Sequence, residues 1–191
     1  MDDAQRRKNT PIHSGVINYF PDALKEVSRV SKAGNDQHHK DKPLHWDRSK
    51  SQDELDALAR HLIDAGKFDT DGQRHSAKIA WRALANLQKE TEKPLIYLSG
   101  KLTNGGVEKC AKYVKRFFEL ETQFEKEGYC VFNPARLEKR GGTWDYYMAR
   151  DLAFIEANEP IMYMMSNWRR SKGSKMEYRL AVDMGLEIRY E

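Results

Sequence analysis

The stretch Pro94-Leu-Ile-Tyr-Leu-Ser-Gly100 decides the fold, because it is an apolar run that ends at a glycine just before a helical pattern. Such a run predicts a buried strand over residues 95–99. Three more apolar runs follow, at residues 129–132, 160–165 and 186–190, and helical patterns separate them over 107–126, 144–157 and 174–184. Strands that alternate with helices at this spacing predict an α/β domain with a parallel sheet and right-handed crossovers.

The residues before this stretch read as helices and loops. Residues 1–20 are polar and are expected to form a mobile tail. Helices are expected over 21–31, 51–65 and 73–90, with a loop over 32–50. The boundary falls at Glu92-Lys93-Pro94, where the pattern changes. The expected organisation is a tail (1–20), a helical N-terminal module (21–93) and a small parallel Rossmann-like sheet flanked by helices (94–191).

The helical module has its own signals. Ser51 and Glu54 have the spacing of a capping box, which predicts the start of the second helix. The residues expected to face inward are Leu55, Leu58, Ala59 and Leu62 on that helix, and Ala77, Ala80, Trp81, Leu84 and Leu87 on the next. Two helices bury little apolar surface alone, so the module is expected to pack on the α/β domain or on a second subunit.

The distribution of charge argues against a nucleic-acid partner. The net charge is +4, but residues 1–93 hold 17 Lys and Arg against 15 Asp and Glu, and residues 94–191 hold 16 against 14. A nucleic-acid-binding protein concentrates its positive charge on one face or in one tail. The even distribution therefore predicts no nucleic-acid partner.

The composition also indicates a location. No run approaches 18 uncharged apolar residues, so no membrane span is expected. The charged start of the chain lacks the apolar segment of a secretory signal. The two cysteines, Cys110 and Cys130, form no disulfide framework and no paired metal-binding spacing. Together these features predict a cytoplasmic protein.

Ligands of open parallel sheets bind beyond the carboxyl ends of the strands. Here that edge is formed by residues 99–106, by Asn133-Pro134 and by residues 166–174. The first and third of these loops lead into helix N-termini, which favour anions. The third loop also carries Arg169, Arg170, Ser171, Lys172 and Ser174. The pattern predicts a phosphate-bearing ligand, and the alternative is a solvated basic loop.

Two carboxylates lie on helix faces that should be apolar. By helical spacing, Asp151 shares a face with Tyr147, Met148 and Leu152, and Glu177 shares one with Leu180, Ala181 and Met184. A buried carboxylate costs several kcal/mol unless it is paired or has a function. The alternative is that each carboxylate pairs with an arginine, such as Arg150 or Arg179, or lies at the margin of the face. Because both acids point to the same sheet edge, we favour a functional site. The expected start of the last helix also puts Glu177 in its first turn, where the helix dipole would favour the ionised form.

From about Leu95 to its end, the chain resembles the nucleoside 2-deoxyribosyltransferase-like superfamily. The superfamily includes deoxyribosyltransferases, deoxynucleoside-monophosphate N-glycosidases and short, often phage-encoded proteins of unassigned function. The matching segments are Ile96-Tyr-Leu-Ser-Gly100, Gly128-Tyr-Cys-Val-Phe-Asn-Pro134, Tyr147-Met-Ala-Arg-Asp151 and Ser171-Lys-Gly-Ser-Lys-Met-Glu177, followed by Ala181 and Gly185.

The resemblance implies roles for individual residues. Glu177 falls on the nucleophilic glutamate, Asp151 on the aspartate that acts beside it, and Tyr97 on the tyrosine of the first strand. Gly100, Ser171 and Gly173 fall on loops around the substrate. Lys101 and Thr103 stand where the monophosphate N-glycosidases have a serine and an arginine for phosphate. Candidate phosphate-binding or substrate-binding residues are Gly100, Lys101, Thr103, Asn133, Ser171, Gly173 and Ser174, and Tyr97 and Trp144 are candidates for bounding the base.

The N-terminal half resembles the N-terminal domain of dATP/dGTP diphosphohydrolases. The matching residues are Arg60-His-Leu-Ile, Asp69-Thr-Asp-Gly72 and His75, whereas Lys78 and Arg82 depart from the family pattern. No ExxE…ExxD pair, which would hold Mg²⁺ between helices, is present in the sequence. A metal or phosphate site is a possible role for His61, Asp64, Asp69, Asp71 and His75. The alternative is that His61 and His75 only pack or cap helices.

Three functions follow as hypotheses. The leading one is cleavage or exchange of the N-glycosidic bond of a deoxynucleoside or its monophosphate through Glu177, which requires no metal or other cofactor. The second is a Mg²⁺-dependent dATP/dGTP diphosphohydrolase that uses the N-terminal residues. The third is a nucleotide-binding or sensing protein without turnover. Each has a small-molecule nucleotide as partner, and a homo-oligomer, most simply a dimer, is expected.

Overall fold

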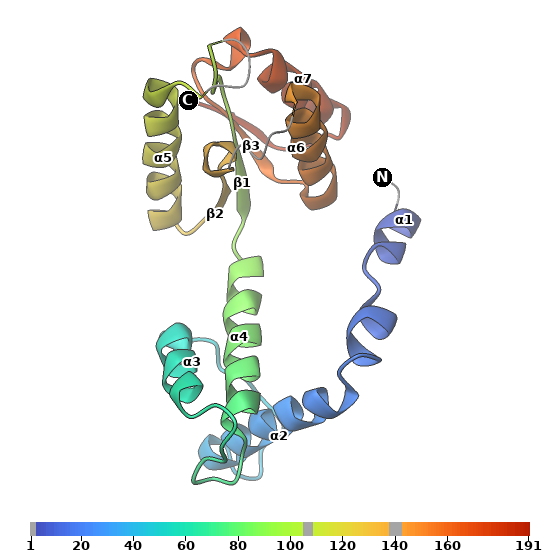
Figure 1. The fold of residues 1–191 in the computed structure, drawn as a ribbon, viewed down its shortest axis with the longest axis vertical. Coiled ribbons are helices and arrows are strands. Elements are labelled where there is room, and N and C mark those ends of the chain that lie inside the picture. Colours follow the sequence, from blue (N-terminus) through green and yellow to red (C-terminus); the bar gives the residue numbers. More distant parts are fainter. Residues whose placement is uncertain (1–2, 105–108, 138–142) are drawn as a thin grey trace. The chain divides into compact units, whose positions relative to one another are not determined.

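The computed structural model describes residues 3–104, 109–137 and 143–191, and it divides into two compact units between Glu90 and Thr91 (Figure 1). The second unit is an α/β domain with a parallel sheet, and the first unit is helical. The predicted fold class is therefore confirmed.

All strands of the sheet are parallel, in the order β2-β1-β3-β4. They are β1 (Leu95–Ser99), β2 (Cys130–Phe132), β3 (Ile161–Met164) and β4 (Ile188–Tyr190). In the register, Tyr97 lies beside Phe132 on one side and Met162 on the other. Every predicted strand is present, although β2, β3 and β4 are shorter than the apolar runs that predicted them.

The helices between the strands also match the pattern. They are α5 (Ala111–Lys126), α6 (Trp144–Asn158) and α7 (Lys172–Asp183), with short 3₁₀ turns η2 (Pro134–Arg136) and η3 (Trp168–Arg170). The predicted helix over 107–126 begins at Ala111 in the structure, and residues 107 and 108 lie outside the described residues. Helix α7 begins two residues earlier than expected, because the Ser171 hydroxyl caps it by accepting the Ser174 N–H at 3.2 Å.

The alternation of side chains along β1 divides the core into two clusters. Ile96 and Leu98 pack with Phe117 and Leu120 of α5 on one face of the sheet. On the opposite face, Tyr97 packs with residues of α6 and α7, the helices that cover that side in Figure 1. Residues two apart on a strand share a face, so the same alternation turns Ser99 toward the α6 and α7 side.

The helical unit contains α1 (Asp3–Lys8), the π-helix η1 (His13–Ile17), α2 (Pro21–His38), α3 (Glu54–Ile63) and α4 (His75–Thr91). Helix α2 continues to His38, so the loop predicted from residue 32 onward begins seven residues too early. The segment expected to be a mobile tail carries α1 and η1, and its mobility stays a prediction.

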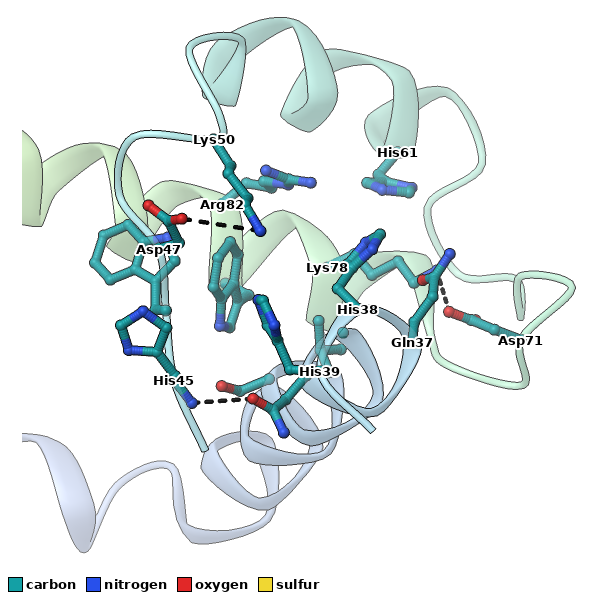
Figure 2. Close-up of a pocket in the computed structure, with 16 residues that line it drawn as sticks. Gln37, His38, His39, His45, Asp47, Lys50, His61, Asp71, Lys78 and Arg82 are labelled. Atoms are coloured by element: carbon teal, nitrogen blue, oxygen red, sulfur yellow. Dashed lines mark hydrogen bonds and ion pairs between the residues drawn. The ribbon is translucent and has the colours of Figure 1, made fainter. Parts of the chain in front are cut away.

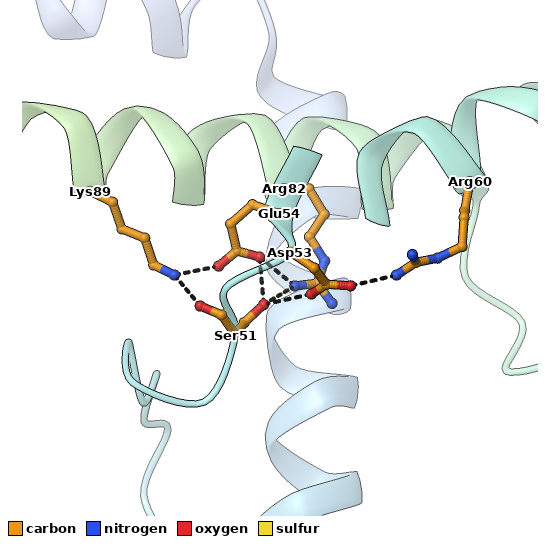
Figure 3. A network of polar contacts seen from close by, with 6 residues as sticks. All are labelled: Ser51, Asp53, Glu54, Arg60, Arg82 and Lys89. Atoms are coloured by element: carbon orange, nitrogen blue, oxygen red, sulfur yellow. Dashed lines mark hydrogen bonds and ion pairs between the residues drawn. The ribbon is translucent and has the colours of Figure 1, made fainter. Parts of the chain in front are cut away.

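The predicted start and inward face of α3 are wrong. The helix begins at Glu54 with Asp53 as N-cap, and no side chain caps it. Glu54 is buried and forms ion pairs with Arg82 at 2.7 Å and Lys89 at 2.8 Å (Figure 3). These pairs turn Glu54 toward α4, so the face that the leucine spacing predicted is not the one that packs inside this unit.

Four leucines that the spacing predicted to face inward are more than half exposed. Leu55 and Leu62 are 63% and 58% exposed, and Leu84 and Leu87 of α4 are 51% and 53% exposed. The buried apolar residues of these two helices are Ala57, Ala77 and Ala85. Among the described residues, no helix combines the length and the apolar character that a membrane span requires.

Candidate functional site

A cavity lies in the α/β domain, where a ligand is expected from the strand order. The chain leaves β1 toward β2 on one side, and β3 lies on the other side of β1. The loops that follow β1 and β3 therefore diverge, and such a switch point is the usual ligand site of open parallel sheets. The cavity has a volume of about 130 Å³. Its polar, aromatic and glycine lining residues are Gly100, Thr103, Lys109, Phe117, Trp144, Tyr147, Arg150, Asp151, Ser171, Gly173, Ser174 and Glu177.

Glu177 of α7 lies at the wall of this cavity, and its side chain is held from β1. The Tyr97 hydroxyl donates a hydrogen bond to Oε1 at 3.0 Å, and the Ser99 hydroxyl donates one to Oε2 at 2.5 Å. Both donors come from the strand face that α7 covers. The carboxyl group is therefore positioned by two neutral hydroxyl groups, and not by Arg179 as in the alternative considered from the sequence.

Burial, the largest influence, and the negative charge of Asp151 together raise the pKa of Glu177 to about 7, while the hydrogen bonds from Ser99 and Tyr97 act in the opposite direction. Glu177 does not lie in the first turn of α7, where it was predicted, because α7 begins at Lys172 and Glu177 falls in its second turn, away from the positive end of the helix dipole. Near neutral pH the Glu177 carboxyl group is therefore present in two forms. The protonated form can donate a proton, and the carboxylate can attack carbon.

Asp151 of α6 is buried at the same cavity. Arg150 donates to its Oδ1 from Nη2 at 2.8 Å and from Nε at 3.1 Å. Burial raises the pKa of Asp151, and the Arg150 guanidinium partly offsets this. The alternative in which an arginine compensates the inward acid is thus confirmed for Asp151. It does not remove Asp151 from the cavity, because both members of the pair line it.

Five of the seven predicted phosphate-binding or substrate-binding residues line the cavity: Gly100, Thr103, Ser171, Gly173 and Ser174. Both glycines permit close packing. A Cβ at Gly100 would lie 2.7 Å from the Met165 sulfur, and one at Gly173 would lie 2.8 Å from the Met148 sulfur. Because Ser171, Gly173 and Ser174 lie at the start of α7, the cavity is lined by a helix N-terminus and by two hydroxyl-bearing residues.

Two predicted residues are not brought to the cavity wall. The buried Asn133 donates to Glu121 Oε2 at 3.0 Å and accepts the Ala135 N–H at 2.9 Å, so its side chain organises the turn after β2. The Lys101 backbone N–H donates to Asn167 Oδ1 at 2.8 Å, and the Lys101 ammonium lies 5.7 Å from the Tyr113 ring centroid. Tyr97 also does not line the cavity, since it lies behind Glu177 and is fully buried.

Sequence reasoning missed several residues of the site. Lys109 lines the cavity and donates from Nζ to the carbonyl oxygens of Ala135 at 2.7 Å and Leu137 at 2.5 Å. From the sequence, Arg150 was expected only as a possible partner of Asp151, and Tyr147 only as part of an apolar face. The charge next to an inward acid was the available signal for Arg150, whereas nothing local distinguishes Lys109 from other lysines.

A larger cavity, of about 250 Å³, lies within the helical unit (Figure 2). Its lining includes His38, His39, His45 and His61, together with Lys50, Lys78, Arg82, Trp46 and Trp81. His61 lies next to His75, with 3.0 Å between the two Nδ1 atoms. Asp69 belongs to the same cluster, whereas Asp64, a predicted member, pairs with Lys67 at 2.8 Å. Asp71 pairs with Lys78 at 2.7 Å.

Fold and cavities together define a class: a parallel α/β domain with a ligand cavity at its switch point, joined in one chain to a helical domain with its own cavity. Residues 94–190 match the family described as Domain of unknown function (DUF4406), and residues 2–97 match the family described as dATP/dGTP diphosphohydrolase, N-terminal. Each match spans half of the chain, and the chain belongs to both families. The resemblance predicted for the N-terminal half is thereby confirmed, and it supports a role in nucleotide metabolism.

The family of the α/β half carries no assigned activity in its description. No curated protein and no solved structure gives a significant match to the chain.

Proposed function

We propose that the α/β domain binds a deoxynucleoside or its monophosphate and cleaves or exchanges its N-glycosidic bond, with Glu177 as nucleophile. The observation that carries the proposal is a buried carboxyl group at a cavity wall, fixed by the Tyr97 and Ser99 hydroxyls, with a second buried carboxyl group, Asp151, at the same cavity. Paired carboxyl groups of this kind perform acid–base and nucleophilic chemistry at sugar carbons in retaining glycosidases.

The reaction has two steps. In the first, a Glu177 oxygen forms a bond to C1′ of the sugar while the C1′–N bond breaks, and the base leaves with the bonding electron pair. A proton from the Asp151 side of the cavity neutralises the leaving nitrogen. In the second, water or another base attacks C1′, gives its proton to the group that protonated the leaving base, and frees the Glu177 carboxylate. A 2-deoxyribose lacks the electron-withdrawing 2′-hydroxyl group, which eases the oxocarbenium-like transition states of both steps.

The other groups of the cavity suit the remainder of such a substrate. The N-terminus of α7 and the hydroxyl-bearing residues Ser171 and Ser174 favour a 5′-phosphate. The Trp144 and Tyr147 rings offer apolar faces for a base. The likeness of the matching segments to the nucleoside 2-deoxyribosyltransferase-like superfamily supports the same assignment of Glu177, Asp151 and Tyr97.

The test is a product analysis with the full chain. Each deoxynucleoside, monophosphate and triphosphate is incubated with the protein in EDTA or in Mg²⁺, and products are separated by liquid chromatography. We expect free base in EDTA from wild type. Glu177→Gln should lose at least roughly a thousandfold in rate, the scale on which removal of a catalytic nucleophile acts. The matched control is Glu125→Gln, an exposed acid on α5, which should keep the wild-type rate. An unchanged rate in Glu177→Gln would remove Glu177 from the mechanism.

The same assay tests a second candidate, Mg²⁺-dependent diphosphohydrolysis, which the family match over residues 2–97 favours. That reaction would give a deoxynucleoside monophosphate and pyrophosphate from a triphosphate, in Mg²⁺ and not in EDTA. Tight nucleotide binding without any product would instead support a sensing protein.

A further inference from the structure

Three side chains of the helical unit converge on one point outside the site proposed above. His61 comes from α3, Asp69 from the turn after it, and His75 from the first residue of α4. One ligand atom of each lies within 4.8 Å of the others. All three side chains are partly buried.

The turn between the two helices fixes this arrangement. Phe68 pairs with Arg74 as an antiparallel bridge, and the Asp69 N–H donates to the Gln73 carbonyl at 2.8 Å. The tip of the turn, Gly72, has a φ of +76°, a conformation that glycine adopts without strain. The turn therefore holds Asp69 beside the start of α4. The backbone hydrogen bonds of the turn thus position the residues of the cluster.

The three side chains of the cluster are held by contacts with one another and with Lys78. The imidazole Nδ1 atoms of His61 and His75 are 3.0 Å apart. Lys78, whose side chain is 14% exposed, donates to one oxygen of Asp69 and to one of Asp71, each at 2.7 Å. Lys78 thus holds Asp69 in place beside the two imidazoles and links it to Asp71 (Figure 2 shows His61, Lys78 and Asp71).

The donor set selects a kind of ion. Mg²⁺ prefers an octahedral shell of oxygen ligands, whereas two imidazoles and one carboxylate suit Zn²⁺, Co²⁺, Fe²⁺ or Ni²⁺. Bonds of about 2.0–2.2 Å place two ligands of one ion roughly 3–4 Å apart, so the three residues need only small side-chain adjustments. The three side chains leave coordination positions open, and His61 also lines the cavity of about 250 Å³.

We propose that His61, Asp69 and His75 bind one divalent transition-metal ion, with open coordination positions for a ligand from the adjoining cavity. The site differs from the Mg²⁺ site that a carboxylate pattern would make, since imidazole nitrogens supply two of its three donors. The proposal is independent of the reaction assigned to the α/β domain, because ion binding is measured without nucleotide.

The test uses the full chain after removal of metals with a chelator. Co²⁺ is titrated in, and its visible absorption reports the coordination of the ion by nitrogen and oxygen ligands; Zn²⁺ is then added as competitor. We expect one Co²⁺ per chain, displaced by Zn²⁺ and not by Mg²⁺. His75→Ala, His61→Gln and Asp69→Asn should each weaken binding at least tenfold. His13→Ala and Asp56→Asn, which change an exposed histidine and an exposed acid outside both the cluster and the cavity, should bind as wild type.

Circular dichroism of each variant shows whether it keeps its helices, and only folded variants are compared. Absence of stoichiometric Co²⁺ binding by wild type would overturn the proposal. So would equal affinity in wild type and a folded His75→Ala or Asp69→Asn protein, because the histidines would then form only a hydrogen-bonded packing pair. Loss of base release in the α/β domain would leave this result unaffected.

Discussion

The ionisation of Glu177 depends on residues that lie far from it in the sequence. The helical pattern identified it as an acid on an inward face, and the structure confirms its burial. The direction of its pKa shift was not predictable in the same way, because its partners Tyr97 and Ser99 lie 80 and 78 positions earlier in the chain. Those donors, together with burial and Asp151, decide when the group is ionised.

The pH dependence of base release should report that ionisation. Because burial raises the pKa of Glu177 to about 7, the attacking carboxylate is depleted below that pH and predominates above it. We expect kcat/KM to rise with pH on a limb centred near 7. A pH series from about 5 to 9 measures it. A flat profile would show that Glu177 does not need to lose a proton.

The same raised pKa has a consequence for stability. A carboxyl group whose folded pKa lies above its unfolded value stabilises the protein below the unfolded pKa, and that contribution is lost as the pH rises through the folded pKa. Glu177→Gln has no charge to bury, so its stability relative to wild type should increase by about 2–3 kcal/mol between about pH 5 and pH 9. Denaturant unfolding at the two pH values measures the difference. A constant difference would contradict the raised pKa.

The polar partners of Asn133 and Lys109 could not be predicted from the sequence. Asn133 was a reasonable candidate because it follows a strand at the ligand edge, but its amide is used by Glu121 and Ala135. Lys109 is the opposite case, since its contacts with two carbonyl groups of the β2 loop are formed only in the folded sheet. Local spacing predicts which face a residue occupies, but not which polar partner reaches it.

At the scale of elements, β1 contributes side chains to both faces of the sheet in the α/β domain. Its alternation sends Ile96 and Leu98 to α5, and Tyr97 and Ser99 to the face where Glu177 lies. The order of strands and helices was predictable, because apolar runs and helical periods are local. The order β2-β1-β3-β4 was not, because it depends on pairings between distant segments.

The loop after β1 should not tolerate a side chain at Gly100. A Cβ there would lie 2.7 Å from the Met165 sulfur and 2.9 Å from the Asn167 oxygen that accepts the Lys101 N–H. We expect Gly100→Ala to destabilise the protein by about 1–3 kcal/mol, the usual cost of overpacking. Gly34→Ala, in α2, is the control: its Cβ meets nothing within 4 Å. Thermal unfolding compares them, and equal melting temperatures would contradict the close approach.

The helical unit depends on a polar contact where the leucine pattern predicted an apolar one. Burial raises the pKa of Glu54, but hydrogen bonds from Lys89, Ser51 and Arg82 outweigh it and leave the pKa below its usual value (Figure 3). Amphipathic periodicity could not predict this face, because it counts a glutamate as a surface residue whatever cations lie opposite.

Glu54→Gln should therefore destabilise the protein at neutral pH by about 1–3 kcal/mol, because it removes a charged acceptor of several hydrogen bonds. A lowered folded pKa means that the contribution of Glu54 is lost as the pH falls through that pKa. The variant and wild type should thus converge as the pH falls below the ordinary pKa of glutamate and through the lowered folded pKa. Asp56→Asn, an exposed acid on the same helix, serves as control. Denaturant unfolding at both pH values tests this, and a difference that persists in acid would contradict it.

At the scale of the whole molecule, the chain joins domains of two families. The change of pattern near Pro94 predicted two modules, and the two family matches meet at that place. Homo-oligomer formation stays a prediction. The fold class was predictable, because apolar runs and helical periods are local, whereas the domain bounds and the roles of the site residues stay predictions.

Covalent capture on Glu177 tests the central claim most directly. A 2-deoxy-2-fluoro nucleoside slows the second step by withdrawing electrons from the sugar, so the glycosyl-enzyme should accumulate. Mass spectrometry of the intact chain and of its peptides then locates the added sugar. We predict one fluorodeoxyribosyl group per chain, on the peptide that contains Glu177, and none in Glu177→Gln. Base released by wild type with no adduct, or an adduct on a different residue, would contradict the assignment of Glu177 as nucleophile.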